Sequence, residues 1–318
     1  MLDRPATSRG KPTTRRRTQR GSRLFWLSLV LPFVGFLLVF TLYPVLQLVR
    51  TALSNVQIID GAFSYSFTGL GNFAQIGSDG TAHYSFLITA LFILVTVPVT
   101  LVLGVVLAIL VDRSVIFARV AHTLLLWPAV ITPVVVSVVW YLILSPNIGG
   151  LNRMLEAFGL PGQSLLASGP GAVSAVMLVD VWHWTPLVFL LVYSSLKGID
   201  GELLEAARVD GAGDWQMYTR IALPLLKPTI IAAALIRLTM GVKTFDEMYL
   251  LTHGGPDNST MLVSLYIRQV FFDQLDLGYG AALSLAVIIG IGVAVTIVLL
   301  GRTLGRSFGQ SPKAVPDV

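Results

Sequence analysis

The sequence predicts an all-α integral membrane protein with six transmembrane helices. Hydrophobic residues make up 54% of its 318 residues and charged residues only 12%, whereas soluble globular proteins carry about 25% charged residues. The apolar residues are gathered in six runs, each of which has the roughly 20 residues that a helix needs to cross a bilayer. Only a helix satisfies the backbone of a single open-ended segment in lipid. These observations predict a polytopic membrane protein.

Residues 1–23 precede the first apolar run and are predicted to form a disordered, basic tail in the cytoplasm. They hold eight Lys or Arg residues against one acid, Asp3, and their Thr, Ser, Gly and Pro content disfavours a packed core. Basic tails also bind nucleic acid, but in front of an apolar run they set membrane orientation, so no nucleic-acid partner is expected. The run that follows is too long for a signal peptide, and no cleavage site closes it.

Each apolar run is expected to form one transmembrane helix. The six runs cover residues 24–48, 84–111, 117–144, 171–196, 227–251 and 279–301. Prolines inside them, such as Pro98 and Pro186, predict kinks, and Trp140 is expected to anchor its helix at the interface. Residues 24–302 then form one six-helix domain, and residues 303–318 form a C-terminal cytoplasmic tail. No internal repeat is evident, so another subunit is expected to complete the pore.

The basic residues predict an N-in, C-in topology. With the N-terminus inside, the cytoplasmic segments hold 17 Lys or Arg residues and the outer segments hold three, Arg50, Arg153 and Arg268. Such an excess marks the cytoplasmic side. The outer loops are then about residues 50–83, 145–170 and 252–278. The polar loop at about 197–228 lies in the cytoplasm.

This polar loop, residues 197–228, is expected to contain a short helix and a sharp bend. Asp200 is expected to cap a helix that begins at Gly201, and the following residues are strong helix formers. Gly211 interrupts this helix, and a second helical piece is expected to run to Pro224. Both ends of the loop are tethered to apolar runs, so a push on it from a partner in water would reach the membrane helices.

Two interpretations of the loop helix remain open from its physical character. It could lie on the membrane surface, or it could insert into a groove of a protein partner. Its apolar face is narrow, and acids outnumber bases between residues 197 and 228, whereas helices that lie on anionic lipid are usually basic. Small alanines and a glycine bend suit a protein groove. Glu205 and Arg208 are spaced to pair on the exposed side.

The loop resembles the EAA motif of ABC importer permeases. The matching residues are Glu205, Ala206, Ala207, Asp210, Gly211, Ala212, Ile221, Leu223 and Pro224. Further residues resemble carbohydrate-uptake permeases of the maltose-transporter permease type: Phe245, Asp246, Tyr249, Leu250, Leu251, Thr252, Gly254, Gly255, Pro256, Ser259 and Thr260. The stretch from Phe67 to Phe73, and Trp182 with Pro186, agree with that type. The resemblance extends over residues 24–302 and implies the MetI-like, type I ABC importer permease fold.

The resemblance implies that the loop carries a coupling helix, which docks on a cytoplasmic ATPase. The contact would be formed by Glu205, Ala206, Ala207, Asp210, Gly211 and Ala212. Glu205 would supply charge-assisted hydrogen bonds, and Gly211 would stay small or adopt a positive φ. The chain has no G-x-x-x-x-G-K-[ST] loop, so ATP and Mg²⁺ would be used by the partner ATPase. This chain would then be a non-catalytic subunit that binds no cofactor.

The implied assembly is a binding-protein-dependent carbohydrate importer of the bacterial cytoplasmic membrane. Its partners would be a second homologous permease that completes a heterodimeric pore, two ATPase subunits, an extracytoplasmic substrate-binding protein and membrane lipid. Transport would proceed by alternating access. The cargo would be a sugar, an oligosaccharide, a polyol or a glycerol phosphate.

Polar residues inside the apolar runs are candidates for a substrate pathway, because ionisable groups in lipid are costly and usually functional. The resemblance implies sugar-contacting positions in the fourth and fifth runs. In the fourth run they are Asp180, His183, Trp184 and Leu187. In the fifth they are Arg237, Thr239 and Met240, with Ile236 and Gly241 as further candidates because the register is uncertain by one residue. Aromatic rings pack on sugar faces while polar groups bond the hydroxyls.

Other interpretations of these charges remain open. Arg237 could neutralise Asp180 across a helix interface without touching substrate, and Lys243 could pair with Asp246 or Glu247. A secondary transporter driven by an ion gradient would use Asp180 and Arg237 as a relay, but it leaves the polar loop unexplained. A membrane-embedded enzyme would need clustered acid–base or metal ligands. The four histidines are scattered along the sequence, and it contains no cysteine.

Overall fold

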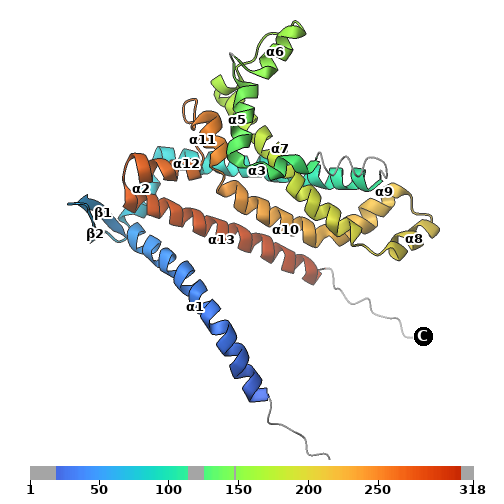
Figure 1. Cartoon of the computed structure of the whole chain (residues 1–318), viewed down its shortest axis with the longest axis horizontal. Helices are drawn as coiled ribbons and strands as arrows, with labels where there is room; N and C mark the ends of the chain where they lie inside the picture. Colours follow the sequence, from blue (N-terminus) through green and yellow to red (C-terminus); the bar gives the residue numbers. More distant parts are fainter. Residues whose placement is uncertain (1–18, 114–124, 147, 309–318) are drawn as a thin grey trace, which may run out of the picture.

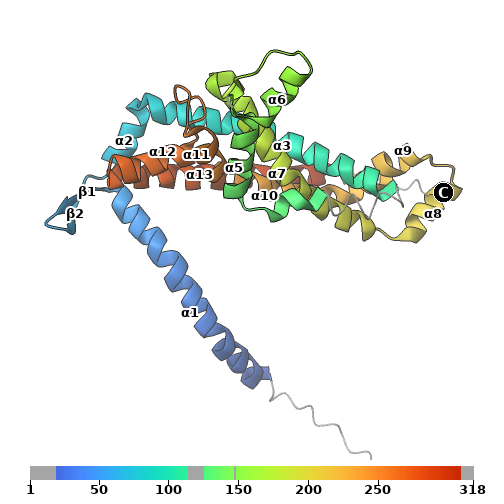
Figure 2. The same cartoon turned by 45° about the horizontal axis from the view of Figure 1, so that its top comes forward.

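A computed structural model describes residues 19–113, 125–146 and 148–308 and shows a mostly helical protein. Five of its helices are long and apolar enough to cross a membrane. They are α1 (Gln19–Ala52), α3 (Gly80–Arg113), α7 (Gly169–Lys197), α10 (Leu223–Val242) with the turns that precede it, and α13 (Leu277–Phe308). Helices α3, α7, α10 and α13 form the body, and α1 diverges from it (Figures 1 and 2).

The ends of the chain are more helical than predicted, as far as they are described. Helix α1 begins at Gln19, inside the segment predicted as a disordered tail, and α13 continues to Phe308, inside the predicted C-terminal tail. Residues 1–18 and 309–318, which make up the rest of both predicted tails, lie outside the described residues.

The predicted helix over residues 117–144 is interrupted. Residues 125–130 are helical, the helix breaks at Ile131 and Thr132, and α5 (Pro133–Leu144) follows. Pro133 lacks an N–H and disfavours helical backbone at the residue before it, and Thr132 is accordingly extended at φ −67° and ψ 146°. One continuous helix over this run was therefore a wrong prediction. Residues 117–124 lie outside the described residues.

The predicted helix over residues 227–251 also ends early. Helix α10 stops at Val242, and a separate short helix, α11 (Asp246–Thr252), follows. At the break, the Thr244 hydroxyl donates to the Met240 carbonyl at 3.0 Å, and the Thr244 carbonyl accepts from the Ser264 hydroxyl at 2.5 Å. Side-chain bonds thus replace helical ones, and the backbone stays satisfied away from water.

A β-hairpin in the first outer loop departs from the all-α prediction. Strand β1 (Ser54–Ile59) pairs antiparallel with β2 (Ala62–Phe67). Asp60 and Gly61 between them both have positive φ, 51° and 77°, as the two-residue hairpin turn favoured by Asp-Gly requires. The dipeptide therefore carries the sequence signal for this hairpin.

The shorter elements lie mainly at the two ends of the body. Helix α2 (Gly71–Ser78) follows the hairpin, and the Asn72 amide fixes it by donating to the carbonyls of Ala52 and Ser54 at 2.9 and 3.0 Å. The other short elements are α6 (Gly150–Ala157), η1 (Leu165–Ala167), α8 (Gly201–Val209), α9 (Asp214–Gln216), η2 (Met217–Ala222), α12 (Val263–Arg268) and η3 (Gln269–Asp273). Helices α8 and α9 lie at the end of the body opposite the hairpin (Figure 1).

Two apolar clusters hold the body together. The first joins α3, α7, α11, α12 and α13, with Phe92 and Leu283 at 2% and 0% exposure. The second joins α3, α7, η2 and α10 and includes Leu226 at 1% exposure. Helices α3 and α7 approach closely at Gly104, where a Cβ would lie 2.5 Å from Cγ1 of Val188. Both clusters therefore depend on the α3–α7 contact.

Asp79 ties together three helices at the hairpin end. Its carboxylate accepts from the backbone amides of Thr81 and Ala82 at the start of α3, at 2.8 and 3.2 Å. It also accepts from the hydroxyls of Tyr266 on α12 and Tyr279 on α13, at 2.5 and 2.6 Å. Burial by itself raises the pKa of the Asp79 carboxyl, but these hydrogen bonds outweigh it and hold the pKa below its ordinary value of 3.8.

We predict that Asp79→Asn lowers the thermal unfolding midpoint of the detergent-solubilised protein at neutral pH. Because the pKa of Asp79 is lower in the folded state, its contribution to stability is complete above the ordinary carboxyl pKa. It is lost as pH falls through the lower folded-state pKa. The difference between the midpoints of wild type and variant should therefore shrink in acid, below pH about 4.

Tyr266→Phe removes one donor to the same carboxylate, and is the matched variant. In the double variant, the drop in the unfolding midpoint should be smaller than the sum of the drops in the two single variants, because the two residues share one hydrogen bond. Equal unfolding midpoints for wild type and Asp79→Asn at neutral pH would contradict the role of Asp79.

Candidate functional site

Helix α8 begins and ends as the sequence predicted. The Asp200 side chain caps it by accepting from the Glu202 amide at 3.0 Å. At the other end Gly211 has φ +83°, with open space where a Cβ would lie. The Gly211 amide donates to the Arg208 carbonyl at 3.0 Å and the Ala212 amide to the Ala207 carbonyl at 2.9 Å. This pair of bonds is the Schellman motif, which requires a left-handed residue at the glycine position.

The predicted coupling residues form a small exposed surface around this turn. Glu205, Ala206, Asp210 and Gly211 are exposed, and Ala207 and Ala212 are half-buried. Val209 is 88% exposed, whereas Leu204 packs against the second apolar cluster. Among the ion pairs of the described chain, none joins Glu205 to Arg208, so the pair that their spacing allows is not formed. The Glu205 carboxylate is thus left exposed for contact with another molecule.

The chain after Gly211 runs directly into the membrane helix. Helix α9 and the π-helical turn η2 lead into α10 without a break, so one apolar helix extends from Asp214 to Val242. The second helical piece was predicted to end at Pro224, but the helix continues through this proline, which is the second residue of α10. Helix α8 is therefore tied to α7 on one side and to α10 on the other.

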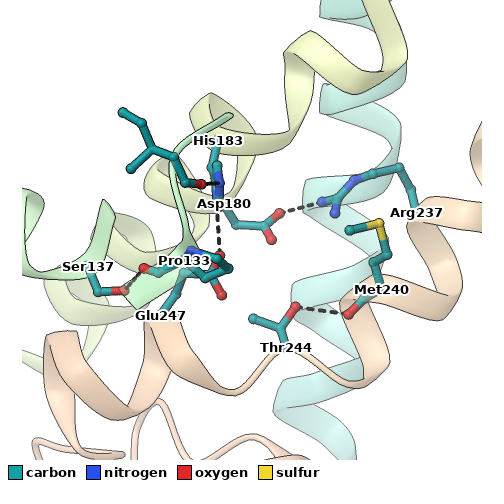
Figure 3. Close-up of polar contacts among 9 residues, drawn as sticks. Pro133, Ser137, Asp180, His183, Arg237, Met240, Thr244 and Glu247 are labelled. Carbon is teal, nitrogen blue, oxygen red and sulfur yellow. Dashed lines mark hydrogen bonds and ion pairs between the residues drawn. The ribbon is translucent and has the colours of Figure 1, made fainter. Parts of the chain in front are cut away.

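A second group of candidate residues lies buried where α7, α10 and α11 meet (Figure 3). The Arg237 guanidinium of α10 and the Asp180 carboxylate of α7 form an ion pair at 2.5 Å, with both side chains at 0% exposure. The sequence allowed Arg237 to neutralise Asp180 across a helix interface, and this pairing is present. Asp180 Oδ1 and Arg237 Nε and Nη1 have no hydrogen-bond partner among the described residues.

His183 joins three elements beside this ion pair. Its Nδ1 lies 3.1 Å from the Glu247 carboxylate of α11, and its Nε2 lies 3.2 Å from the Ile131 carbonyl at the break before α5. A carbonyl oxygen only accepts, so Nε2 is the donor in the second bond. The side chains of His183 and Glu247 are both buried, at 1% and 4% exposure, and their contact gives each a polar partner, as buried polar groups require.

The other predicted substrate-pathway residues surround this buried group. The Trp184 ring is half-buried, stacks at 4.5 Å on His183 and lies 5.8 Å from the Arg237 guanidinium. Met240 and Leu187 are half-buried. Thr239 is exposed, and its hydroxyl donates to the Leu235 carbonyl of its own helix at 2.9 Å. The structure thus brings together Asp180, His183 and Arg237, with Met240 nearby (Figure 3), and Trp184 lies against His183 and Arg237.

Glu247 and Trp140 make contacts that the sequence did not suggest. Glu247 pairs with His183, and no ion pair of the described chain involves Lys243, so neither of the Lys243 pairs that the spacing allows is present. Trp140, expected as an interfacial anchor, packs edge-to-face on Trp182 at 5.5 Å. The partnership of Glu247 with His183 depends on the break between α10 and α11, and 64 residues separate the two in sequence. Spacing within one helix gave no signal for it.

Comparisons with known proteins agree on the type of protein. The family described as "Binding-protein-dependent transport system inner membrane component" matches residues 84–306. The sulfoquinovosyl glycerol transport system permease protein SmoG of Agrobacterium fabrum is 32% identical over 280 residues, covering 88% of this chain and 90% of that protein. The trehalose/maltose transport system permease protein MalF of Thermococcus litoralis is 30% identical, covering 88% and 94%.

A solved structure supports the same fold. It is the crystal structure of a bacterial alginate ABC transporter in complex with an alginate pentasaccharide-bound periplasmic protein. One of its chains superposes with a TM-score of 0.77 at 23% identity, covering 93% of this chain and 99% of that one.

The fold and the polar loop define a multi-pass membrane permease subunit, which is not itself catalytic. The chain belongs to the family of binding-protein-dependent transport system inner membrane components. This confirms the resemblance to ABC importer permeases of the carbohydrate-uptake type that its motifs suggested.

We predict that breaking the Asp180–Arg237 pair is far more damaging than removing it. Arg237→Met alone should lower the free energy of unfolding by about 3–5 kcal/mol, because it leaves an unpaired buried carboxylate. The double variant Asp180→Leu/Arg237→Met should recover most of this loss. Unfolding of the purified protein in micelles measures both.

The exposed pair formed by Arg268 and Asp273 is the matched control, since its side chains are 33% and 49% exposed. Arg268→Gln should cost less than about 1 kcal/mol. If the double variant is as unstable as Arg237→Met, the unpaired Asp180 carboxylate is not the cause of the lost stability.

Proposed function

We propose that this chain is the transmembrane permease subunit of an ATP-driven, binding-protein-dependent carbohydrate importer that works by alternating access. The observation that carries the proposal is the exposed α8–Gly211 turn, which is continuous with α7 and α10. The names of the relatives support a cargo of the sugar, oligosaccharide, polyol or glycerol-phosphate class. They include permeases for sulfoquinovosyl glycerol, for trehalose and maltose, and for lactose. The same relatives do not favour the alternative of an ion-gradient-driven transporter.

In this proposal α8 is the coupling helix that docks on the ATPase subunit. The contact residues are Glu205, Ala206, Ala207, Asp210, Gly211 and Ala212. The exposed Glu205 carboxylate offers an acceptor for charge-assisted hydrogen bonds, and the small alanines let a groove of the partner approach the helix backbone closely. ATP and Mg²⁺ are used by the partner, and this chain binds neither. Closure of the ATPase dimer then moves α7 and α10 through their links to α8.

The proposed assembly contains a second homologous permease, two ATPase subunits and an extracytoplasmic binding protein, in a bacterial cytoplasmic membrane. The chain crosses the membrane six times with both termini inside, and residues 24–302 form its permease domain. Helix α1 supports the presence of a partner within the membrane, because its residues 28–46 are all exposed. Lipid and the second permease would cover it. The basic residues before α1 stay in the cytoplasm.

The proposed substrate pathway runs along α7 and α10. Trp184 supplies a ring for a sugar face, and Leu187, Thr239 and Met240 extend the wall. Asp180, His183 and Arg237 lie behind this wall when the pathway is closed. Because Asp180 Oδ1 and two Arg237 nitrogens lack partners among the described residues, they are available to sugar hydroxyls once α7 and α10 separate. A hydroxyl both donates and accepts, so it suits both groups.

We predict that Gly211→Asp leaves the complex assembled but abolishes uptake and substrate-stimulated ATP hydrolysis. At φ +83° a residue with a Cβ is strained by about 1–2 kcal/mol, and an added carboxylate changes the charge of the docking surface. The assay uses proteoliposomes with the ATPase, the second permease and the binding protein loaded with the ligand that co-purifies with it.

Gly213→Asp is the matched control for this loop variant. Gly213 also has open space around it, but its φ is −68°. The Gly213→Asp variant should therefore transport normally. Normal uptake by Gly211→Asp would exclude the coupling role. Uptake that survives ATP depletion and collapses with an uncoupler would instead favour the ion-gradient alternative.

We predict that Trp184→Ala reduces uptake by about tenfold or more without releasing the ATPase, because buried aromatic contacts are typically worth 2 kcal/mol or more to binding. Trp182→Ala is the matched control. Trp182 lies two positions away and lines a groove of about 690 Å³ between α3 and α7, on another face of the helix. Equal uptake by wild type and Trp184→Ala would remove Trp184 from the pathway.

A further inference from the structure

A cluster of charged and tyrosine side chains lies at the base of α8, where α3, α7 and η2 meet. Its centre is Asp112, the penultimate residue of α3 and the only acidic residue of that helix. Asp112 Oδ1 pairs with Lys197 Nζ at 2.6 Å, and Asp112 Oδ2 accepts from the Tyr218 hydroxyl at 2.8 Å. Both oxygens of one carboxylate are thus occupied, each by a different segment of chain.

The two partners of Asp112 lie on either side of the coupling loop. Lys197 is the last residue of α7, before α8, and Tyr218 belongs to η2, after the Gly211 turn. The carboxylate therefore closes the loop of residues 198–217 onto the end of α3. A second link joins the same region, since the Arg113 guanidinium pairs with Asp214 at 2.9 Å.

The Asp112–Tyr218 hydrogen bond is shielded from water, whereas the Arg113 pair is not. The side chains of Arg113 and Asp214 are 44% and 63% exposed. That of Asp112 is 19% exposed, although its partner Lys197 is 53% exposed. Tyr218 is 7% exposed and belongs to the second apolar cluster. Solvent weakens exposed pairs, and a hydrogen bond from a buried hydroxyl to a charged carboxylate is stronger. Asp112 is therefore the stronger of the two attachments.

Apolar contacts also attach the loop to the end of α3. The second apolar cluster contains Val111 of α3, Leu196 of α7 and Met217 of η2, and Leu204 of α8 packs against it. These contacts press the ends of the helices together but are not directional. The Asp112 hydrogen bonds fix the angle at which the loop leaves the body.

We propose that Asp112 is a positioning residue for transport: it fastens both ends of the coupling loop to α3, so that α8 and α3 move as one unit. The inference rests on the proposed coupling function. Since α3 and α7 share both apolar clusters of the body, a push on α8 then reaches the wall of the substrate pathway through α3 as well as through α7 and α10.

The chain contains no cysteine, which allows spin labels to be placed at chosen sites. One pair, Val209→Cys with Leu110→Cys, reports the attachment of α8 to α3. A second pair, Leu110→Cys with Ile297→Cys, reports movement of α3 against α13. All three positions are exposed, at 88%, 55% and 64%. Pulsed electron paramagnetic resonance is recorded on the full complex with cysteine-free partner subunits, in phosphatidylethanolamine/phosphatidylglycerol nanodiscs, with and without ATP plus vanadate.

With Asp112 intact, we expect one narrow α8–α3 distance that ATP plus vanadate does not change, and an α3–α13 distance that shifts. In Asp112→Asn the first distribution should broaden and the shift of the second should be lost. Asp214→Asn, which removes only the exposed pair, should keep both signals. Lys197→Met tests the same attachment from the other side if Asp112→Asn assembles poorly.

The outcomes separate this inference from the function on which it rests. A residue with only a structural role would lower the yield of complex but leave the shift in the assembled fraction. If the parent shifts and both Asp112→Asn and Lys197→Met shift equally, the inference is overturned while the coupling function stands. If ATP plus vanadate shifts nothing in the parent, the proposed coupling function fails, and the inference fails with it.

Discussion

The need to pair the buried charges of Asp180 and Arg237 constrains how the helices of the body pack. Charges inside an apolar protein in lipid must be paired, because an isolated buried charge costs several kcal/mol. This pair joins α7 to the C-terminal half of α10, with Asp180 Oδ2 and Arg237 Nη2 2.5 Å apart. His183, three residues further along α7, is matched in the same way by Glu247 and by the Ile131 carbonyl.

His183 also makes contacts at two breaks between helices in the described part of the chain. The break before Pro133 frees the Ile131 carbonyl to meet His183, and the break between α10 and α11 carries Glu247 to the same imidazole. In lipid a broken helix is stable only where side chains or other backbone groups satisfy the freed polar atoms. The Thr244 and Ser264 hydroxyls do so at the second break. The helix breaks and the buried charges thus stabilise one another.

The buried pair is connected to the coupling loop by one helix. From His183, α7 runs to Lys197 and, through a two-residue cap and Asp200, into α8. On the return, η2 continues into α10, which carries Arg237. The ion pair therefore joins the two helices that lead into and out of the segment of α8 and the Gly211 turn. A displacement of α8 that separates α7 from α10 would also strain the Asp180–Arg237 pair. The energy of this pair therefore depends on the position of the loop.

The sequence by itself determined the class of protein, five of the membrane helices to within a few residues at most ends, the Asp200 cap and the left-handed Gly211. These features depend on hydrophobicity and on local backbone preferences, which act over a few neighbouring residues. The hairpin also had a local signal in Asp60-Gly61. Only the tertiary structure decided where the helices break and which charges pair, Glu247 with His183 and Asp112 with Lys197 and Tyr218. These partners lie far apart in sequence, and a charge in an apolar interior takes whichever partner the packing of helices brings within reach.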